Sequence, residues 1–189
     1  MKQKQPSAIA AFFDFDETLL AIDSAGIGFK VLREQGYLTK TFMLKMAISM
    51  LLKKAGLINE KIIARTFLSF YKGRDPQPFI DSAQSFYDEH LQPNLSPAVT
   101  QNQEQGHQTV LVTGSIEYYL KPVIEDLGID HLLCSHLEID NDGLFSGRSK
   151  GPICVGEAKV TLAKVLAEIH GIDLAQSYSY GNSELDIPM

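Results

Sequence analysis

The sequence predicts an α/β fold, in which a parallel sheet forms the core and a helical segment is inserted after the first strand. Two short, mainly apolar runs, Ala8–Phe13 and Thr109–Gly114, have the length and composition of strands that are buried on both faces. Residues 24–91 lie between these runs and show helical spacing without strand alternation. From residue 107 onwards strand and helix patterns alternate, which is typical of a parallel sheet with right-handed crossovers.

The first strand and the helical insertion open the chain. The apolar run leads into Asp14, and after Leu20 the apolar spacing changes to that of helices. Glycines mark the ends of the first two helices, and Asn59 is a suitable cap for the third. The predicted helices cover residues 21–36, 39–55, 60–71 and 78–91.

The second of these helices is rich in methionine and other apolar residues over residues 42–52. One interpretation is an adaptable apolar wall for a substrate that carries a lipid or aromatic group. We expect instead that this helix forms the core of a small helical bundle. Lys45, Lys53 and Lys54 are then most simply a solvated face.

The second half of the chain supplies the rest of the sheet. The predicted strands are residues 109–114, 132–139 and 177–181, and the predicted helices are 116–127 and 157–170. A tight hairpin turn is expected at residues 141–143, with 144–148 returning from it. Together these elements predict a Rossmann-like parallel sheet core that carries an inserted helical cap.

Composition and charge exclude several classes of function. The 189 residues are 44% hydrophobic and 21% charged, values that are ordinary for a soluble globular protein. The net charge of −6 argues against nucleic acid or an anionic membrane as a major partner. No apolar stretch is long enough for a membrane span, and no signal peptide is recognisable. Because Cys134 and Cys154 have no metal-ligand spacing, we expect reduced thiols and a cytoplasmic protein, and the oligomeric state stays open.

Acidic and hydroxyl side chains follow the first strand directly. Asp14 and Asp16 are two residues apart in an extended segment, so their side chains can face one ligand together. Two carboxylates at such a distance are unfavourable unless a cation or a proton is shared between them. The pattern therefore predicts a divalent-metal site at the carboxyl edge of the sheet. The alternative is an acidic turn after a strand, with Thr18 as a helix cap.

Residues that suit phosphate chemistry follow two further strands. They are Thr113, Gly114 and Ser115 after the second strand, and Asn182 and Asp186 after the last one. Lys159 lies in the first turns of the helix over residues 157–170. Phosphoryl transfer needs a positioned nucleophile, a cation on the transferring oxygens and donors around them, all of which this set can supply. Neither a GxxxxGKS loop nor a GxGxxG motif occurs, so nucleotide kinase and dinucleotide functions lack support.

Four segments in this order resemble the motifs of the haloacid dehalogenase superfamily: DFDETL, LVTGS, GEAK and YGNSELDIP. Within it, the chain resembles the phosphoserine-phosphatase-like hydrolases of subfamily IB. The resemblance covers nearly all of residues 8–189 and is weakest in the helical insertion. It implies a Mg²⁺-dependent phosphomonoesterase that acts through an aspartyl-phosphate intermediate on a small phosphorylated metabolite.

The resemblance also implies a role for each matched residue. Asp14 would be the nucleophile, and Asp16 would protonate the leaving alkoxide and then activate water. Thr113 would hydrogen-bond a phosphoryl oxygen, and Lys159 would neutralise the developing charge. Thr18, Gly114 and Ser115 are expected to lie beside the substrate phosphate. The residues expected to hold Mg²⁺ are Asp14 through its side chain, Asp16 through its backbone carbonyl, and Asn182 and Asp186 of the last motif.

The resemblance further divides the chain into a core and a cap. Residues 1–20 and 96–189 would form the catalytic core, and residues 21–95 the helical cap that closes over the site and sets substrate choice. Asp23 falls where relatives keep an acidic residue that faces the substrate or the catalytic pair. An Asp before Ser24 is equally a good helix start.

Three features depart from the family pattern. Asn182 stands where relatives have Asp, and because its amide oxygen brings no charge, we expect a lower affinity for Mg²⁺. The cap does not match the Phe and Arg pattern by which phosphoserine phosphatases hold the serine carboxylate. The chain stops at Met189, soon after Asp186, so we expect the core to lack its last C-terminal elements.

Two other functions compete with the phosphomonoesterase. The first is a catalytically weakened relative that binds a phosphorylated ligand or partner, which Asn182 and the early stop favour. The second is a phospho-accepting signalling receiver, which also uses Asp, Thr and Lys on an α/β sheet. Receivers accept phosphate on a later strand and have no long insertion after the first Asp, so we favour the enzyme.

Overall fold

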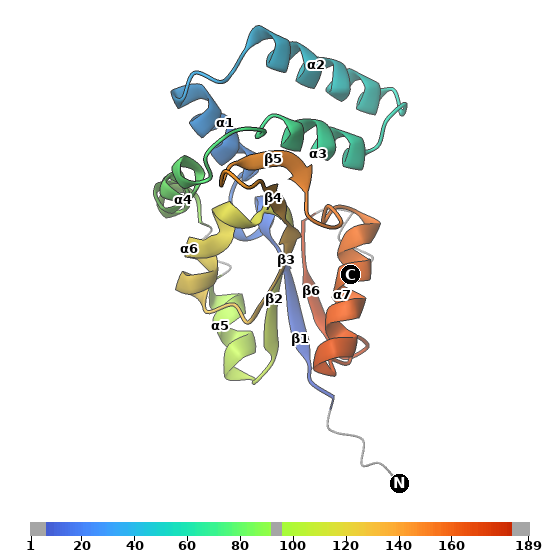
Figure 1. Cartoon of the computed structure of the whole chain (residues 1–189). Helices are drawn as coiled ribbons and strands as arrows, with labels where there is room; N and C mark the ends of the chain where they lie inside the picture. The colour runs from blue at the N-terminus through green and yellow to red at the C-terminus, as the bar shows by residue number, and fades with distance from the viewer. Residues whose placement is uncertain (1–6, 92–95, 183–189) are drawn as a thin grey trace.

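The computed structural model describes residues 7–91 and 96–182 and has a parallel sheet at its centre (Figure 1). The strands of this sheet are β1 (Ala10–Asp14), β2 (Gln108–Ile116), β3 (His131–Ser135) and β6 (Tyr178–Tyr180). They pair in the order β3-β2-β1-β6, and every pairing is parallel. The predicted α/β class with a Rossmann-like core is confirmed.

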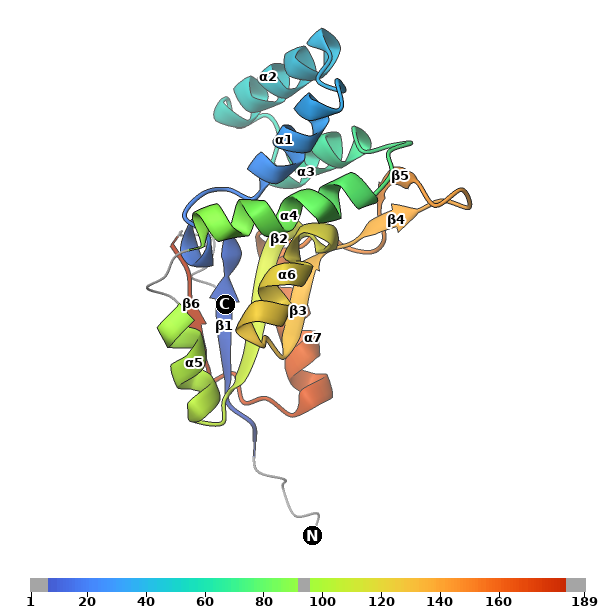
Figure 2. The same cartoon turned by 90° about the vertical axis from the view of Figure 1, so that its left-hand side faces the viewer.

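The described part of the chain contains seven α-helices. They are α1 (Ala25–Glu34), α2 (Lys40–Lys54), α3 (Glu60–Ser69), α4 (Gln77–His90), α5 (Ser96–Glu104), α6 (Glu117–Leu127) and α7 (Glu157–His170). Helices α5 and α6 cover one face of the sheet and α7 the other, while α1 to α4 lie beyond the carboxyl ends of the strands (Figures 1 and 2). The sequence patterns predict all of these helices except α5.

Strand β1 lies between two apolar layers, as its sequence predicts. Ala11 and Phe13 belong to the core beneath α5 and α6, whereas Ala10 and Phe12 belong to the core beneath α7. All four side chains are buried. A strand with both faces buried needs apolar residues at every position, which explains the unbroken apolar run.

The strand predicted over residues 132–139 is wrong as a single element. The chain leaves the sheet after Ser135, and β4 (Leu137–Ile139) pairs antiparallel with β5 (Phe145–Ser149) in a separate two-stranded sheet. The chain leaves the sheet because the predicted hairpin turn forms at residues 141–143. The Asp140 carboxylate accepts hydrogen bonds from the backbone N–H groups of Asp142 and Leu144, and Gly143 adopts a left-handed φ of 80°. This turn lets the chain reverse and pair with itself.

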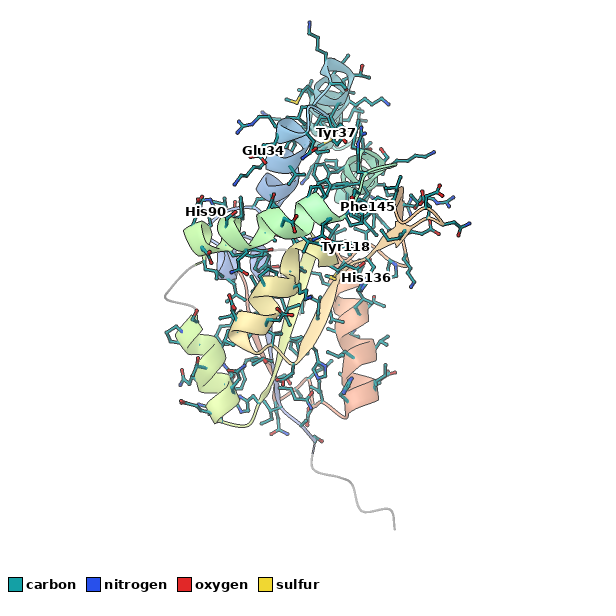
Figure 3. The ribbon with its side chains drawn as sticks, turned by 60° about the vertical axis from the view of Figure 1, so that its left-hand side comes forward. Glu34, Tyr37, His90, Tyr118, His136 and Phe145 are labelled. Atoms are coloured by element: carbon teal, nitrogen blue, oxygen red, sulfur yellow. The ribbon has the colours of Figure 1, made fainter. Side chains whose placement is uncertain are left out.

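The β4–β5 hairpin connects the core to the inserted helices. The Phe145 ring contacts Tyr71 and Phe79 of the insertion and Tyr118 of α6, with ring centroids 5.6, 5.7 and 5.0 Å away. Its backbone carbonyl also accepts a hydrogen bond of 2.7 Å from the N–H of Gly73. Figure 3 shows Phe145 and Tyr118 near each other, where the hairpin meets α4 and α6. One aromatic side chain therefore holds several elements together at this junction.

The chain enters and leaves the inserted helices at neighbouring positions. Leu20 and Leu91 form an isolated antiparallel bridge, and the N–H of Ala21 donates to the carbonyl of His90 at 2.9 Å. Because the inserted helices begin and end at neighbouring positions, they do not interrupt the pairing of the strands in the sheet. The boundaries between core and cap, at residues 20–21 and 95–96, stay a prediction.

The expectation that α2 forms the core of a bundle is wrong. Phe42 and Ser49 are its only buried residues among those described, while Leu44 and Leu51 are 61% and 67% exposed. The reason is that α2 packs along one side on α3, and no described element covers its outer side. The three lysines of α2 that were assigned to a solvated face are exposed, as expected. Within the described ranges, we find no helix with the length and apolarity that crossing a membrane requires.

We predict that Gly28→Ala destabilises the protein. A Cβ at position 28 would lie 2.2 Å from the Tyr71 hydroxyl and 2.6 Å from the Tyr119 hydroxyl, and both rings are fully buried. Overpacking of this kind lowers the free energy of unfolding by about 1–3 kcal/mol. Gly26→Ala in the same helix is the matched control, because its Cβ would lie 3.3 Å from the nearest atom and the change should stay within about 1 kcal/mol. Equal urea midpoints for the two variants would contradict the prediction.

Candidate functional site

A buried ion pair lies at the carboxyl end of β1. The Lys159 Nζ lies 2.6 Å from Asp14 Oδ1, and the two side chains are only 10% and 7% exposed. Strand β1 ends at Asp14, and α7 begins two residues before Lys159, so two elements far apart in sequence bring the charges together. A charge this buried must be compensated, which the pair achieves. The sequence-based placement of both residues at one site agrees with this geometry.

The chain turns sharply after β1. Asp16 keeps an extended backbone with φ −68° and ψ 129°, but Glu17 adopts the left-handed conformation with φ 56°. Only a few per cent of non-glycine residues have positive φ, and such residues gather at functional sites. This turn also buries Thr18, whose hydroxyl lies 3.5 Å from Asp14 Oδ2 and donates towards it. Thr18 therefore lies beside the first carboxylate and caps no helix.

The Asp16 carboxylate is held by hydrogen bonds from three directions. The backbone N–H of Ser24 donates to Oδ1 at 2.7 Å, while the hydroxyls of Thr113 and Ser115 lie 3.3 and 3.4 Å from Oδ2. The ladder between β2 and β3 shifts register between Val112 and Ile116, which is where these hydroxyl residues lie. An irregularity of this kind re-aims side chains at the end of a strand. The structure thus joins the polar ends of β1 and β2 at Asp16, as the sequence predicts.

Burial raises the pKa of the Asp16 carboxyl from 3.8 to about 6. The two hydrogen bonds with Ser24 oppose this effect, whereas the neighbouring carboxylates of Asp23 and Asp14 add to it. A carboxyl group with a pKa near 6 can hold a proton or release it close to neutral pH. This property suits a general acid and base.

The predicted metal ligands lie only partly within the described residues. The side-chain amide of Asn182 donates to the Glu17 carboxylate at 3.2 Å, which brings the last motif to the turn after β1. Asp186 lies outside the described residues. Among the residues that are described, no three His, Cys, Asp or Glu side chains are grouped as a metal site. The donors offered by Asp14, Asp16 and Asn182 are carboxylate, carbonyl and amide oxygens, which are the ligand types that Mg²⁺ takes, so the donor set fits the ion.

The sequence patterns did not indicate Ser24, which contacts the site, or Tyr87, whose pKa is affected by the charge of Asp16. Ser24 is buried, and besides its bond to Asp16 its hydroxyl hydrogen-bonds to that of Ser115. Tyr87 of α4 is also buried, and its hydroxyl has no hydrogen-bond partner among the described residues. Burial raises the pKa of Tyr87, and the charge of Asp16 raises it further. The position of Ser24 at a helix start was the only signal for it, and Tyr87 had none.

A cavity of about 210 Å³ opens beside Asp16. Its polar wall comprises Asp16, Asp23, Ser24, Ser115 and Ser135, and its other lining residues are Ala25, Ala64, Phe67, Leu68, Gly114, Ile116, Tyr119, Ile153 and Val155. Asp23 therefore faces the cavity, and its carboxylate also accepts a hydrogen bond from the N–H of Ala25 at 2.8 Å. The hydrogen bond to Ala25 agrees with a position at the start of α1, and a role of Asp23 towards the substrate stays a prediction.

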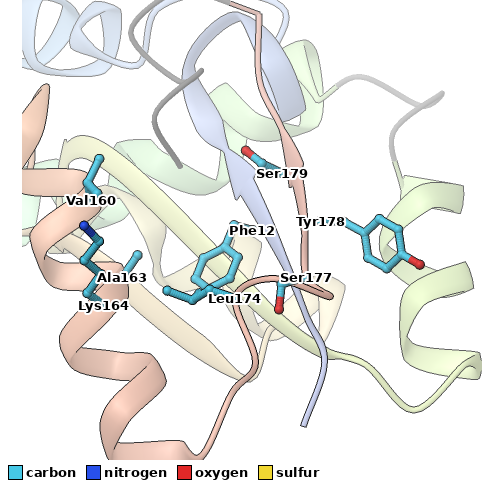
Figure 4. A pocket seen from close by; sticks show the side chains of 8 residues that line it. All are labelled: Phe12, Val160, Ala163, Lys164, Leu174, Ser177, Tyr178 and Ser179. Carbon is cyan, nitrogen blue, oxygen red and sulfur yellow. The ribbon is translucent and has the colours of Figure 1, made fainter. Parts of the chain in front are cut away.

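A second cavity, of about 240 Å³, lies between α7 and β6 (Figure 4). Its lining residues are Phe12, Val160, Ala163, Lys164, Leu174, Ser177, Tyr178 and Ser179. Among the described residues, this lining contains one cationic side chain and no carboxylate, and Phe12 faces the side of the sheet that α7 covers. The cavity beside Asp16 is therefore the better candidate for a reaction site, because it alone of the two holds an acid with a raised pKa.

We predict that Asp16→Asn stabilises the metal-free protein above pH 6 relative to the wild type. Because the folded-state pKa of Asp16 is raised from 3.8 to about 6, the unfolded chain loses this proton first as pH rises. The free energy of unfolding of the wild type therefore falls between about pH 4 and pH 6, by about 1–3 kcal/mol relative to that of the variant. Above about pH 6 the difference in free energy between the two proteins is constant. Urea unfolding of both proteins in EDTA across this pH range measures the difference in free energy. Parallel stability curves would show that Asp16 ionises normally in the folded state.

Comparison with known proteins identifies the family. The haloacid dehalogenase-like hydrolase family matches residues 11–189. A phosphoserine phosphatase of Mycobacterium tuberculosis, SerB1, is 29% identical over 188 residues, which are 95% of this chain and 61% of that protein. The chain spans 61% to 67% of the length of the first curated relatives that it matches.

Solved structures support the same fold. A protein of unknown function from Bordetella pertussis aligns with a TM-score of 0.80 and 22% identity, over 96% of this chain and 85% of that one. A phosphoserine phosphatase solved as a phospho-aspartyl intermediate analogue aligns with a TM-score of 0.71 and 20% identity, over 97% and 82% of the two chains. At these identities the likeness shows the fold, and the match over residues 11–189 shows that the chain belongs to the haloacid dehalogenase-like hydrolase family.

Proposed function

We propose that this protein is a Mg²⁺-dependent phosphomonoesterase that works through an aspartyl-phosphate intermediate. The observation that carries the proposal is the presence of two unlike carboxyl groups at the carboxyl end of β1, one of which lines the cavity. Asp14 forms a buried ion pair with Lys159 at 2.6 Å, whereas Asp16 is only partly exposed and desolvation raises its pKa to about 6. Two carboxyl groups in such unlike environments, one paired with a cation and one with a raised pKa, are suited to separate roles as nucleophile and as acid–base. The phosphatase names of relatives in the same family support the reaction class.

In the first step the Asp14 carboxylate attacks phosphorus, and the bond from phosphorus to the leaving oxygen breaks. Asp16 gives its proton to that oxygen, so an alcohol leaves. In the second step Asp16 takes a proton from water, whose oxygen attacks phosphorus and displaces Asp14 as a free carboxylate. The Thr113 hydroxyl and the Lys159 ammonium stabilise the charge on the phosphoryl oxygens.

Mg²⁺ would be held by the Asp14 side chain, the Asp16 carbonyl, Asn182 and Asp186. The ion supplies positive charge that offsets the phosphoryl oxygens and the carboxylates around them. Since Asn182 contributes a neutral ligand, we propose that the ion is held more weakly than by an aspartate at this position. We propose that the remaining phosphate contacts come from Thr18, Gly114 and Ser115.

The inserted helices are proposed to act as a cap that selects the substrate. The cavity has walls from both parts of the chain: Phe67 and Leu68 come from α3, and Ile116 and Ile153 from the core. We propose a cap of residues 21–95, a core of residues 1–20 and 96–189, and a cytoplasmic location.

The lining of the cavity supports a small leaving group that carries no carboxylate. None of the described lining residues is Arg or Lys, and the cap side presents Ala64, Phe67 and Leu68. A carboxylate placed there would have no cation to pair with and would face the carboxylate of Asp23. Neutral or cationic alcohols are therefore proposed as leaving groups, in contrast to serine.

A catalytically weakened protein that binds a phosphorylated ligand remains the second candidate. The observation that favours it is Asn182, whose amide contributes no charge and donates to Glu17. This candidate predicts ligand binding without turnover, which separates it from the enzyme.

We predict that Asp14→Asn lowers turnover of p-nitrophenyl phosphate with Mg²⁺ by about 10³-fold or more, because the covalent step loses its nucleophile. Acid-quenched wild type should carry a phosphoryl mass increment that this variant lacks. Asp126→Asn, an exposed residue of α6, is the control and should keep normal turnover. Near-normal turnover by Asp14→Asn would exclude the covalent mechanism. A wild type that binds monoesters but turns over none at any Mg²⁺ concentration would favour the weakened protein.

We predict that O-phosphoethanolamine is hydrolysed with a higher kcat/KM than O-phosphoserine, by about tenfold or more. The two compounds differ by one carboxylate, which the cavity cannot pair and Asp23 repels. Propyl phosphate serves as the reference with an uncharged leaving group. If O-phosphoserine is the best of the three substrates, a cation outside the described lining must reach the cavity, and the proposed leaving-group class is wrong.

A further inference from the structure

An apolar surface lies on the outer side of α2, at the end of the molecule farthest from the sheet (Figures 1 and 2). We define it as the α2 face. Its residues are Met43, Leu44, Ala47, Ile48, Met50 and Leu51. Their spacing of three and four residues places them on one side of the helix. The five larger side chains are 47–67% exposed.

The α2 face is opposite the side by which the helix is held to the protein. Phe42, which is 1% exposed, packs its ring on Phe70 with centroids 4.1 Å apart, and Met46 packs against the same core. Figure 3 shows the side chains of α2 projecting outward at the tip of the molecule. An exposed contiguous apolar face of this kind marks an interaction site rather than a chance surface.

The charges around the α2 face indicate what covers it. Lys40 lies four residues before Leu44, and Lys54 lies three residues after Leu51, so a lysine stands at each end of the face. Both lysines are exposed. No Asp or Glu occurs between Glu34 and Glu60, although the whole chain carries a net charge of −6. The region around α2 is therefore locally cationic, although the net charge of the chain is negative.

We propose that the α2 face binds the surface of an anionic phospholipid bilayer. A helix with an apolar side and lysines around it lies in the bilayer interface, where lysine stems extend their ammonium groups to the lipid phosphates. A second copy of this chain fits less well. In a twofold contact the faces would bring Lys40 and Lys54 towards the same lysines of the partner, with no carboxylate to pair them. The position of α2 at the tip lets a flat surface reach it.

The test is flotation of the intact chain with phosphatidylcholine vesicles that either contain or lack phosphatidylglycerol. The wild type should float with the anionic vesicles, and Lys40→Gln/Lys54→Gln should weaken this association. Leu44→Ser/Leu51→Ser should lower the partition coefficient by about tenfold or more, because two apolar side chains no longer enter the bilayer. Met43→Ser/Met50→Ser is a second variant of the same face, should the first fold poorly.

The matched control is Val165→Ser/Ile169→Ser on α7. These residues are 48% and 71% exposed, are four positions apart, and lie away from α2. This variant should bind vesicles as the wild type does, with circular dichroism confirming that all variants fold. The proposal is overturned if the wild type does not float with anionic vesicles, or if the α7 variant loses as much binding as the α2 variants. It is also overturned if the α2 face instead forms a dimer by light scattering that Leu44→Ser/Leu51→Ser disperses. Vesicle flotation does not depend on phosphatase activity. The result would therefore stand even if the protein proved not to be a phosphatase.

Discussion

The ion pair between Asp14 and Lys159 is the interaction on which the site depends. Strand β1 has apolar layers on both faces and ends in a carboxylate that is 7% exposed, a position in which an unpaired charge is strongly unfavourable. Lys159 compensates that charge, and its helix must begin at the carboxyl edge of the sheet to do so. The pair thus links the placement of α7 to the end of β1.

The second carboxyl group couples the sheet to the inserted helices. Asp16 accepts a hydrogen bond from the backbone of Ser24, just before α1, and lies within reach of the Thr113 and Ser115 hydroxyls of β2. The environment that raises its pKa is therefore built from both sides of the junction. A displacement of the inserted helices would change the burial of Asp16, and with it the ease with which the group holds a proton. The Phe145 ring contacts keep this junction packed from the side of the hairpin.

The inserted helices have two unlike surfaces. Towards the core, α3 contributes Phe67 and Leu68 to a small cavity in which the described lining has no cation. Away from the core, α2 presents apolar side chains between Lys40 and Lys54. Net charge alone misrepresents this end of the molecule, because interactions with a surface depend on charges within about a Debye length, roughly 8–10 Å, rather than on the chain average.

The sequence by itself determined most of the helices, the central strands β1 and β2, and the polar residues at the ends of these strands. Apolar run length predicted β1, helical spacing predicted α1 to α4, and the motif residues Asp14, Thr113 and Lys159 were expected together. These features depend on local periodicity and on the rule that parallel strands end at one edge.

Only the tertiary structure decided what covers each apolar face and which hydrogen bonds close the site. Residues 132–139 have the pattern of one strand, yet the chain leaves the sheet at His136 because the hairpin supplies another partner. The apolar side of α2 was expected to be core, and no described element packs on it. Ser24 contacts Asp16 through folding of the inserted helices. Periodicity reveals that a face is apolar, but burial, and the pKa shifts that burial causes, depend on neighbours that are distant in sequence.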